Sequence, residues 1–128
     1  MVSTLARDIS VVFVVDDEAL ITKSLSLILS REGFEVSSFN NPLVAIEHMK
    51  VNPPDLLISD VMMPQLSGVD LAIQTAESVP QCRILLFTAS TEDLLRTARD
   101  QGHHFRLLRK PVHPAQLLKE IDQLIEDK

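Results

Sequence analysis

The sequence predicts an α/β fold, a single doubly wound sheet of five parallel strands in the order 2-1-3-4-5, with five helices. Apolar runs alternate with helical stripes along the chain, which is typical of a parallel sheet joined by right-handed crossovers. Three of the five runs are unbroken, as in strands buried on both faces, and the second and fifth are mixed with polar residues. Mixed strands suit sheet edges, and the order 2-1-3-4-5 places these two strands there.

Each strand is predicted from its own run of residues. The unbroken runs cover residues 11–15, 56–58 and 84–87 and predict the three central strands. The mixed runs cover residues 34–39 (FEVSSF) and 105–109 (FRLLR) and predict the two edge strands.

The helices are predicted from apolar residues at the i, i+3, i+4, i+7 spacing of an amphipathic helix. Gly33 follows the first helix as a C-terminal glycine would, and Pro42 and Pro114 stand where proline often opens a helix. A weaker stripe predicts a helix within residues 91–101. The five stripes, in chain order, are Ile21, Leu25 and Ile28; Ala45, Ile46 and Met49; Val69, Ala72, Thr75, Ala76 and Val79; Leu94, Leu95 and Ala98; and Leu117, Leu118, Ile121, Leu124 and Ile125.

Length and composition bound the class of protein. The 128 residues fit one domain, and we expect a lead-in over residues 1–9 and the domain over residues 10–128. A net charge of −6 argues against direct binding to nucleic acid. No apolar run has the length of a membrane span and no signal peptide is recognisable, so we expect a cytoplasmic protein without membrane contact. Cys82, the single cysteine, lies in a predicted buried strand and is expected to be an inert core thiol.

Polar residues follow four of the predicted strands where each strand ends. They are Asp16 and Asp17 after the first, Asp60 after the third, Thr88 after the fourth and Lys110 after the fifth. The carboxyl ends of parallel strands open on one edge, and ligands bind there where the strand order reverses. In this order the crevice lies between the first and third strands, so it would contain the three aspartates.

The chemistry of these side chains favours phosphoryl transfer. Carboxylates without nearby histidine or cysteine suit a hard cation, Mg²⁺ or Mn²⁺. An aspartate can accept a phosphoryl group, and an ammonium and a hydroxyl can neutralise and position it. Taken singly, an aspartate or threonine at a strand end is more often a helix cap or turn residue, and a lysine is more often a solvated charge. The joint placement of all five residues is what favours a site.

With these residues in place, the chain resembles the receiver domain of bacterial response regulators from about residue 10 to 126. The matching pieces are VVDDE, LLISDVMMPQLSG, ILLFTAS and LLRKPV, in that order. The resemblance implies that Asp60 accepts a phosphoryl group from a histidine of a partner kinase or phosphotransfer protein. It also implies that Asp17 binds Mg²⁺ directly, Asp16 binds it through water, and the backbone carbonyl of Met62 supplies a third protein ligand.

The resemblance implies further roles near the phosphorylation site. Thr88 would hydrogen-bond the phosphoryl group, and Lys110 would pair with one of its oxygens. The Lys110–Pro111 peptide bond would be cis. Phosphorylation would change the face made by the fourth helix, fifth strand and fifth helix, which would bind a downstream effector. The protein would be a monomer or a phosphorylation-dependent dimer.

The chain departs from the family pattern at one switch position. Receiver domains often have an aromatic residue three positions before the conserved lysine, and here that residue is Leu107. Phe105, two residues earlier, should point to the same side of the strand. We therefore expect switching either to use the fourth helix with repacking of Leu107 or to be weak.

Two further positions bear on how long the phosphoryl group would persist. Met62 follows Asp60 by two residues and Ser90 follows Thr88 by two. A thioether is a weak acceptor for orienting an attacking water, so we expect slow self-dephosphorylation.

Three functions of different classes are compatible with these residues. The first is a phosphorylation-controlled interaction switch, the second is a relay carrier that passes the phosphoryl group to a histidine phosphotransfer protein, and the third is a receiver that works by docking alone. The chain would catalyse its own phosphorylation without being a metabolic enzyme. A dehalogenase-type phosphatase would need an acid two residues after Asp60, where Met62 stands.

Overall fold

Five parallel strands form one sheet in the order β2-β1-β3-β4-β5, as predicted. The structure is a computed structural model that describes residues 9–88 and 105–126. Apolar β-branched and leucine-rich runs give the central strands, and β3 is buried along its whole length. The strands are β1 (Val11–Val15), β2 (Glu35–Phe39), β3 (Leu56–Asp60), β4 (Arg83–Thr88) and β5 (Arg106–Arg109).

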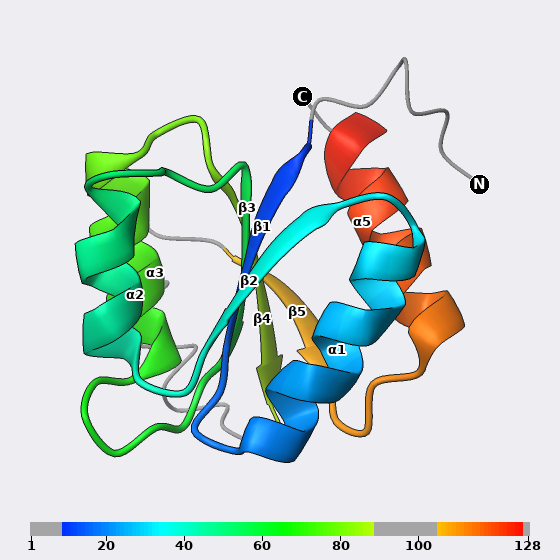
Figure 1. The fold of residues 1–128 in the computed structure, drawn as a ribbon, viewed down its shortest axis with the longest axis horizontal. Helices are drawn as coiled ribbons and strands as arrows, with labels where there is room; N and C mark the ends of the chain where they lie inside the picture. The colour runs from blue at the N-terminus through cyan, green and yellow to red at the C-terminus, as the bar shows by residue number, and fades with distance from the viewer. Residues whose placement is uncertain (1–8, 89–104, 127–128) are drawn as a thin grey trace.

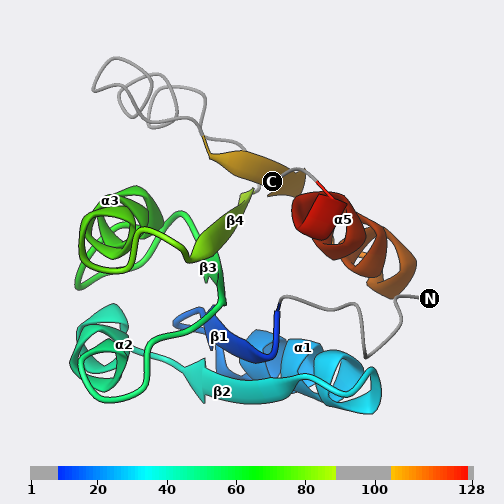
Figure 2. The ribbon, with the colours of Figure 1, turned by 90° about the horizontal axis from the view of Figure 1, so that it is seen from above.

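Helices cover both faces of the sheet (Figures 1 and 2). α2 (Pro42–Met49) and α3 (Gly68–Ser78) lie on one face, and α1 (Ala19–Arg31) and α5 (Pro114–Glu126) lie on the other. The described part of the chain therefore contains four helices rather than the five predicted. The helix expected within residues 91–101 lies outside the described residues.

Local sequence signals set the ends of these helices. Gly33 has φ 93° and follows the C-cap of α1, where the N–H groups of Gly33 and Phe34 donate to the carbonyls of Ser30 and Leu29. This pair of bonds is a Schellman motif, which needs a left-handed residue. Asn41 caps α2 by accepting from the Leu43 N–H at 2.9 Å, with proline at the first helical position. These predicted helix ends are confirmed.

Strand boundaries differ from the prediction where polar residues take part in pairing. β3 continues through Ser59 to Asp60, because both residues pair in register, Ser59 with Val15 and Asp60 with Phe87. The predicted strand, which is defined by its apolar residues, ends at residue 58. Backbone pairing does not depend on the type of side chain, so the strand itself continues for two polar residues. β2 begins at Glu35 rather than at residue 34, because the preceding N–H is used in the C-cap of α1.

Side chains that alternate along the strands divide the core into two clusters. Val12, Val14 and Ile58 pack toward α1 and α5, whereas Phe13, Val15 and Leu57 pack toward α2 and α3. This period-2 alternation holds a rigid central sheet between the helical layers. The carboxyl ends of the strands consequently have fixed positions relative to one another.

Within the described residues, no helix is long and apolar enough to cross a membrane.

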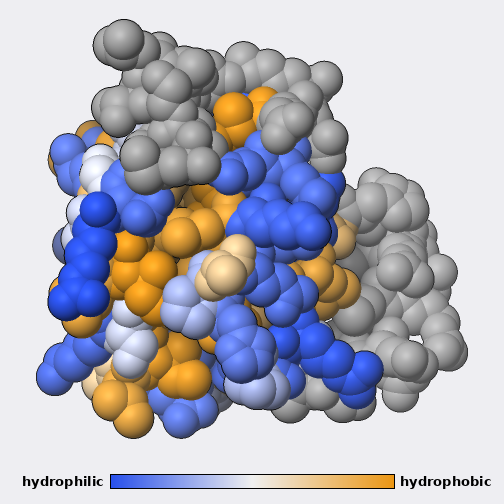
Figure 3. All heavy atoms as spheres, turned by 90° about the vertical axis from the view of Figure 1, so that its right-hand side faces the viewer, coloured by the Kyte–Doolittle hydropathy of each residue, from blue (hydrophilic) through white to orange (hydrophobic). Residues whose placement is uncertain are grey.

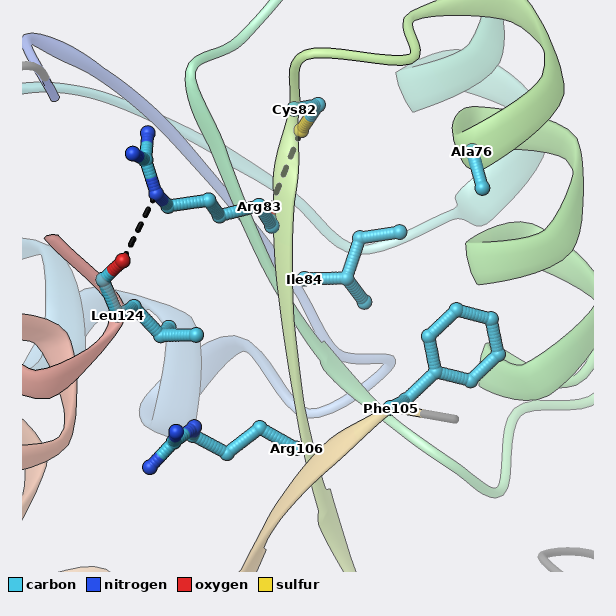
Figure 4. A pocket seen from close by; sticks show the side chains of 7 residues that line it. All are labelled: Ala76, Cys82, Arg83, Ile84, Phe105, Arg106 and Leu124. Atoms are coloured by element: carbon cyan, nitrogen blue, oxygen red, sulfur yellow. Dashed lines mark hydrogen bonds between the residues drawn. The ribbon is translucent and has the colours of Figure 1, made fainter. Parts of the chain in front are cut away.

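Cys82 lies at the amino-terminal edge of the sheet, far along the strands from the carboxyl ends. Its thiol is 8% exposed and donates to the backbone carbonyl of Arg83 at 3.3 Å. Cys82 lines a hollow of about 580 Å³ at the start of β4 and β5. Figure 4 shows the side chains around this hollow. Burial raises the pKa of the Cys82 thiol to about 12, so the thiolate is disfavoured. The expected place of Cys82 in the core is confirmed.

Candidate functional site

Three carboxylates meet at the carboxyl edge of the sheet, between β1 and β3. Asp16 and Asp17 follow β1, and Asp60 is the last residue of β3. Each offers a carboxylate oxygen, and these oxygens lie within 4.8 Å of one another. Asp16 is fully buried, Asp60 is 6% exposed and Asp17 is exposed. The predicted crevice therefore brings together the predicted acids, and their mutual repulsion calls for compensation by positive charge.

Lys110 supplies positive charge to these carboxylates from the segment that follows β5. It follows β5, and its Nζ lies 3.3 Å from Asp60 Oδ1 and 3.6 Å from Asp16 Oδ2. The Nζ also lies 5.2 Å from the centre of the Phe87 ring, which favours a cation over its face. The Lys110–Pro111 peptide bond is cis, as expected. A single ammonium thus contacts both buried carboxylates.

Asp16 is held in a way that leaves one oxygen without a hydrogen-bond donor. Its Oδ1 accepts from the Glu18 N–H at 2.9 Å, while no donor among the described residues hydrogen-bonds the buried Oδ2, whose nearest cation, Lys110 Nζ, lies 3.6 Å away. Burial, aided by the negative charge of Asp60, raises the pKa of Asp16 to about 6, although the hydrogen bond from the Glu18 N–H and the charge of Lys110 act in the opposite direction. An oxygen-only donor set with a buried, unsatisfied oxygen suits a hard cation such as Mg²⁺.

The backbone of Asp60 is confined on two sides. Ser59 Oγ donates to the Asp60 carbonyl at 2.9 Å. Gly68, at the start of α3, lies so close that a Cβ there would be 1.9 Å from the same carbonyl oxygen. The Gly68 N–H donates to the Val61 carbonyl at 2.7 Å. Only glycine fits at position 68, because the two backbones approach each other so closely. This close contact orients the end of β3, which carries the Asp60 carboxylate.

The remaining residues predicted at or near the site are Thr88, Met62, Leu107 and Ser90. Thr88 ends β4 and is 7% exposed, and its carbonyl accepts from the Lys110 N–H at 2.9 Å. The Met62 side chain is 58% exposed beside Asp60. Leu107 pairs with Leu86 in register and packs, like Phe105, into the cluster on the α2 and α3 face. The expected common direction of Leu107 and Phe105 is thus confirmed. Ser90 lies outside the described residues.

Sequence reasoning missed two residues next to this site. Gly68 could have been suspected, because a glycine opening a helix is unusual, but the sequence does not show what it approaches. Asn40, after β2, donates to the carbonyl of Asp16 at 2.9 Å. No local pattern marks it, because the contact joins segments 24 residues apart.

A doubly wound parallel sheet with acids and a lysine at its switch point defines a flavodoxin-like α/β protein with a candidate cation site. The family model of the response regulator receiver domain matches residues 12–122. The chain belongs to this family, which confirms the resemblance found in the sequence.

Relatives of known description agree with this family. The chain is 27% identical over 114 residues to the response regulator receiver protein CpdR of Brucella abortus, covering 89% of this chain and 95% of that protein. It is 35% identical over 112 residues to the transcriptional regulatory protein PdtaR of Mycobacterium tuberculosis, covering 87% of this chain and 54% of that protein. The chain thus spans nearly all of the first relative and about half of the second.

Solved structures agree with the fold. A response regulator receiver domain protein from Clostridium thermocellum has a TM-score of 0.80 at 28% identity, covering 91% of this chain and 94% of that one. A chemotaxis protein of Vibrio cholerae has a TM-score of 0.81 at 25% identity, covering 91% of this chain and 98% of that one.

Proposed function

We propose that this chain is the phospho-acceptor domain of a two-component system, in which a phosphoryl group on Asp60 changes the interactions of the protein. The donor would be a phosphohistidine of a kinase or of a histidine phosphotransfer protein. The observation that carries the proposal is the single ammonium of Lys110 in contact with two of three clustered carboxylates, 3.3 Å from Asp60. Three carboxylates against one ammonium leave the site net negative, so a divalent cation would have to join Lys110 before the site receives a group that brings further negative charge.

In the proposed reaction, a carboxylate oxygen of Asp60 bonds to phosphorus while the bond from phosphorus to the imidazole nitrogen breaks. The imidazole leaves with the electron pair of that bond, and an acyl phosphate forms. Lys110 would pair with a phosphoryl oxygen, and the Thr88 hydroxyl would donate to another. Both groups lie at strand ends that the sheet holds in place, so little reorganisation is needed.

The residues that would hold Mg²⁺ or Mn²⁺ are Asp16, Asp17 and Asp60, together with the backbone carbonyl of Met62. Bound there, the cation would neutralise the carboxylates and the oxygens of the incoming phosphoryl group. The support comes from the buried Asp16 Oδ2, which accepts no hydrogen bond from the described residues.

An apolar groove beside the site offers a place for the phosphodonor. It has a volume of about 490 Å³, lies between α1 and the segment after β5, and includes Lys110 in its wall. Figure 3 shows apolar surface on this face of the molecule, and Leu20 at its rim is 77% exposed. A donor helix could cover these side chains while it presents a histidine to Asp60. The other residues of the wall are Ile21, Ser24, Leu25, Ile28, Phe87, Pro111 and Val112.

The output would use the face formed by the fourth helix, β5 and α5. Of these elements, β5 and α5 lie in the described part of the chain. Arg106 of β5 donates to Glu120 at 3.2 Å and to Gln123 at 3.0 Å, both on α5. A shift of β5 would thus be transmitted to α5, which supports a switch that downstream effectors read.

The proposal is tested by intact mass after incubation with acetyl phosphate or phosphoramidate, with Mg²⁺ or with a chelator. We expect the wild-type protein to gain one phosphoryl group only when Mg²⁺ is present. Asp60→Asn should gain none, because an amide does not accept the group. A wild-type protein that gains nothing under any condition would contradict the proposal and favour a receiver that works by docking alone.

The lifetime of the acyl phosphate follows from the exposed Met62 side chain beside Asp60. We expect slow self-dephosphorylation, because a thioether orients the attacking water poorly. The measurement is the loss of the added mass after the phosphodonor is removed. Met62→Glu should shorten the lifetime by roughly tenfold or more, since general-base groups typically contribute at least that much. A wild-type lifetime below about a minute would contradict slow turnover, on the usual contribution of water positioning.

A slow turnover would also suit a relay carrier, the second function that the sequence left open. The phosphorylated protein is mixed with a histidine phosphotransfer protein, and the same mass measurement shows which of the two carries the phosphoryl group. This experiment separates the two functions. A carrier should pass the group on within its lifetime, whereas a terminal switch should retain it.

A further inference from the structure

We propose that Asn40 is a positioning residue of the cation site, because its amide fixes the peptide unit that joins Asp16 to Asp17. This inference rests on the proposed function, since it concerns the same site. Asn40 contributes no ligand atom and would act only through the backbone that carries the two acids.

The contacts of Asn40 converge on the loop between β1 and α1. Its Nδ2 donates to the backbone carbonyl of Asp16 at 2.9 Å and to Thr22 Oγ1 at 3.0 Å. Directly before it, the Phe39 carbonyl accepts from the Asp16 N–H at 3.1 Å. The end of β2 therefore holds Asp16 through both its N–H and its carbonyl.

The held carbonyl belongs to the peptide unit between the two acids. A peptide unit is planar, so fixing its carbonyl oxygen limits the rotation that would move the Cα atoms of Asp16 and Asp17 on either side. Asp17 is exposed, in contrast to the buried Asp16. Its carboxylate thus depends more on the backbone for its position, and Asn40 supplies part of that restraint.

The second hydrogen bond ties the same loop to α1. Thr22 is 1% exposed, and its hydroxyl accepts from Asn40 and donates to the Ala19 carbonyl at 3.0 Å. A side-chain amide can donate two hydrogen bonds from one nitrogen, which an aspartate or a threonine cannot. Asn40 therefore connects the loop and the first turn of the helix at a single point.

The adjacent Asn41 provides a matched control. It has the same side chain, but its oxygen caps α2 by accepting from the Leu43 N–H at 2.9 Å. Removing either amide should weaken the fold to a similar degree. Only the loss of the Asn40 amide should loosen the acids of the site.

The test compares Asn40→Ala and Asn41→Ala with the wild-type protein. The chain has no tryptophan or tyrosine, so calorimetric titration with Mn²⁺ or Mg²⁺ measures the dissociation constant. We expect Asn40→Ala to raise it about tenfold, the lower end of the usual effect of residues that orient ligands, and Asn41→Ala to change it less than twofold. Amide hydrogen exchange of the cation-free protein should be faster in Asn40→Ala only at Asp16 and Glu18, whose N–H groups donate to Phe39 O and Asp16 Oδ1.

The outcomes separate this inference from the proposed function. If the wild-type protein binds the cation and Asn40→Ala binds it equally well, the positioning role is wrong while the cation site stands. If both variants weaken binding equally, the effect is one of stability and the inference is again wrong. If the wild-type protein binds no cation, the proposed site fails and this inference fails with it.

Discussion

Replacing Lys110 with methionine should destabilise the cation-free protein by on the order of 3 kcal/mol at neutral pH. Lys110 makes both ion pairs recorded for Asp16 and Asp60 within the described residues, at 3.6 and 3.3 Å. Methionine keeps much of the apolar stem but leaves the two buried carboxylates without their cation. Urea unfolding followed by circular dichroism measures the change, since the chain lacks tryptophan and tyrosine.

This loss should depend on pH in a defined direction. The pKa of Asp16 is already raised to about 6, and removing Lys110 should raise it further. A carboxyl with a raised pKa destabilises the folded protein above that pKa, and the effect disappears below the ordinary value of about 4. The difference between Lys110→Met and wild type should therefore shrink as the pH falls from 8 toward about 6, where Asp16 becomes protonated in the folded state of both proteins. A difference that stays constant over this range would contradict the buried-charge explanation.

The same substitution should slow phosphorylation by acetyl phosphate by about 100-fold or more, because the proposed reaction would lose the charge that stabilises the transferring group. Lys119→Met is the matched control, since Lys119 is exposed on α5. It should leave stability and phosphorylation close to those of the wild-type protein. Added Mg²⁺ should recover part of the stability of Lys110→Met, because it compensates the same carboxylates.

Replacing Gly68 with alanine should destabilise the protein by about 3 kcal/mol or more, as over-packing against immovable atoms does. The new Cβ would meet only backbone atoms, at 1.9 Å from Asp60 O, 2.8 Å from Asp60 C and 2.9 Å from Val61 Cα. Helix propensity alone predicts the opposite sign, a gain of up to about 1 kcal/mol. The sign of the change in urea unfolding therefore decides between the two effects.

Gly68→Ala should also slow phosphorylation, because relief of the clash displaces the end of β3 and with it the Asp60 carboxylate. A displacement of about 1 Å can cost 100-fold in rate. Gly33→Ala is the control, since Gly33 has φ 93° at the end of α1 and should lose stability for a local reason. Equal rates for Gly68→Ala and Gly33→Ala, measured where both are folded, would contradict a role of Gly68 in placing Asp60.

The predicted site residues illustrate what local sequence can show. Asp16, Asp60 and Lys110 each follow or end an apolar run, and parallel strands bring such ends to one edge whatever the details of packing. Their meeting could therefore be predicted from the order of elements. The polar end of β3 could not be assigned in the same way, because Ser59 and Asp60 join the strand through backbone pairing with β1 and β4.

The order of the strands, the helix ends at Gly33 and Pro42, and the set of side chains at the carboxyl edge could all be predicted from the sequence. These features depend on hydrophobic period and backbone preference, which are local. The tertiary structure alone decided that Asn40 holds the Asp16 carbonyl and that Gly68 lies against Asp60. The first contact joins the ends of two strands that the crossover through α1 brings side by side, and the second depends on the path of the loop between β3 and α3. Side-chain type specifies neither distance.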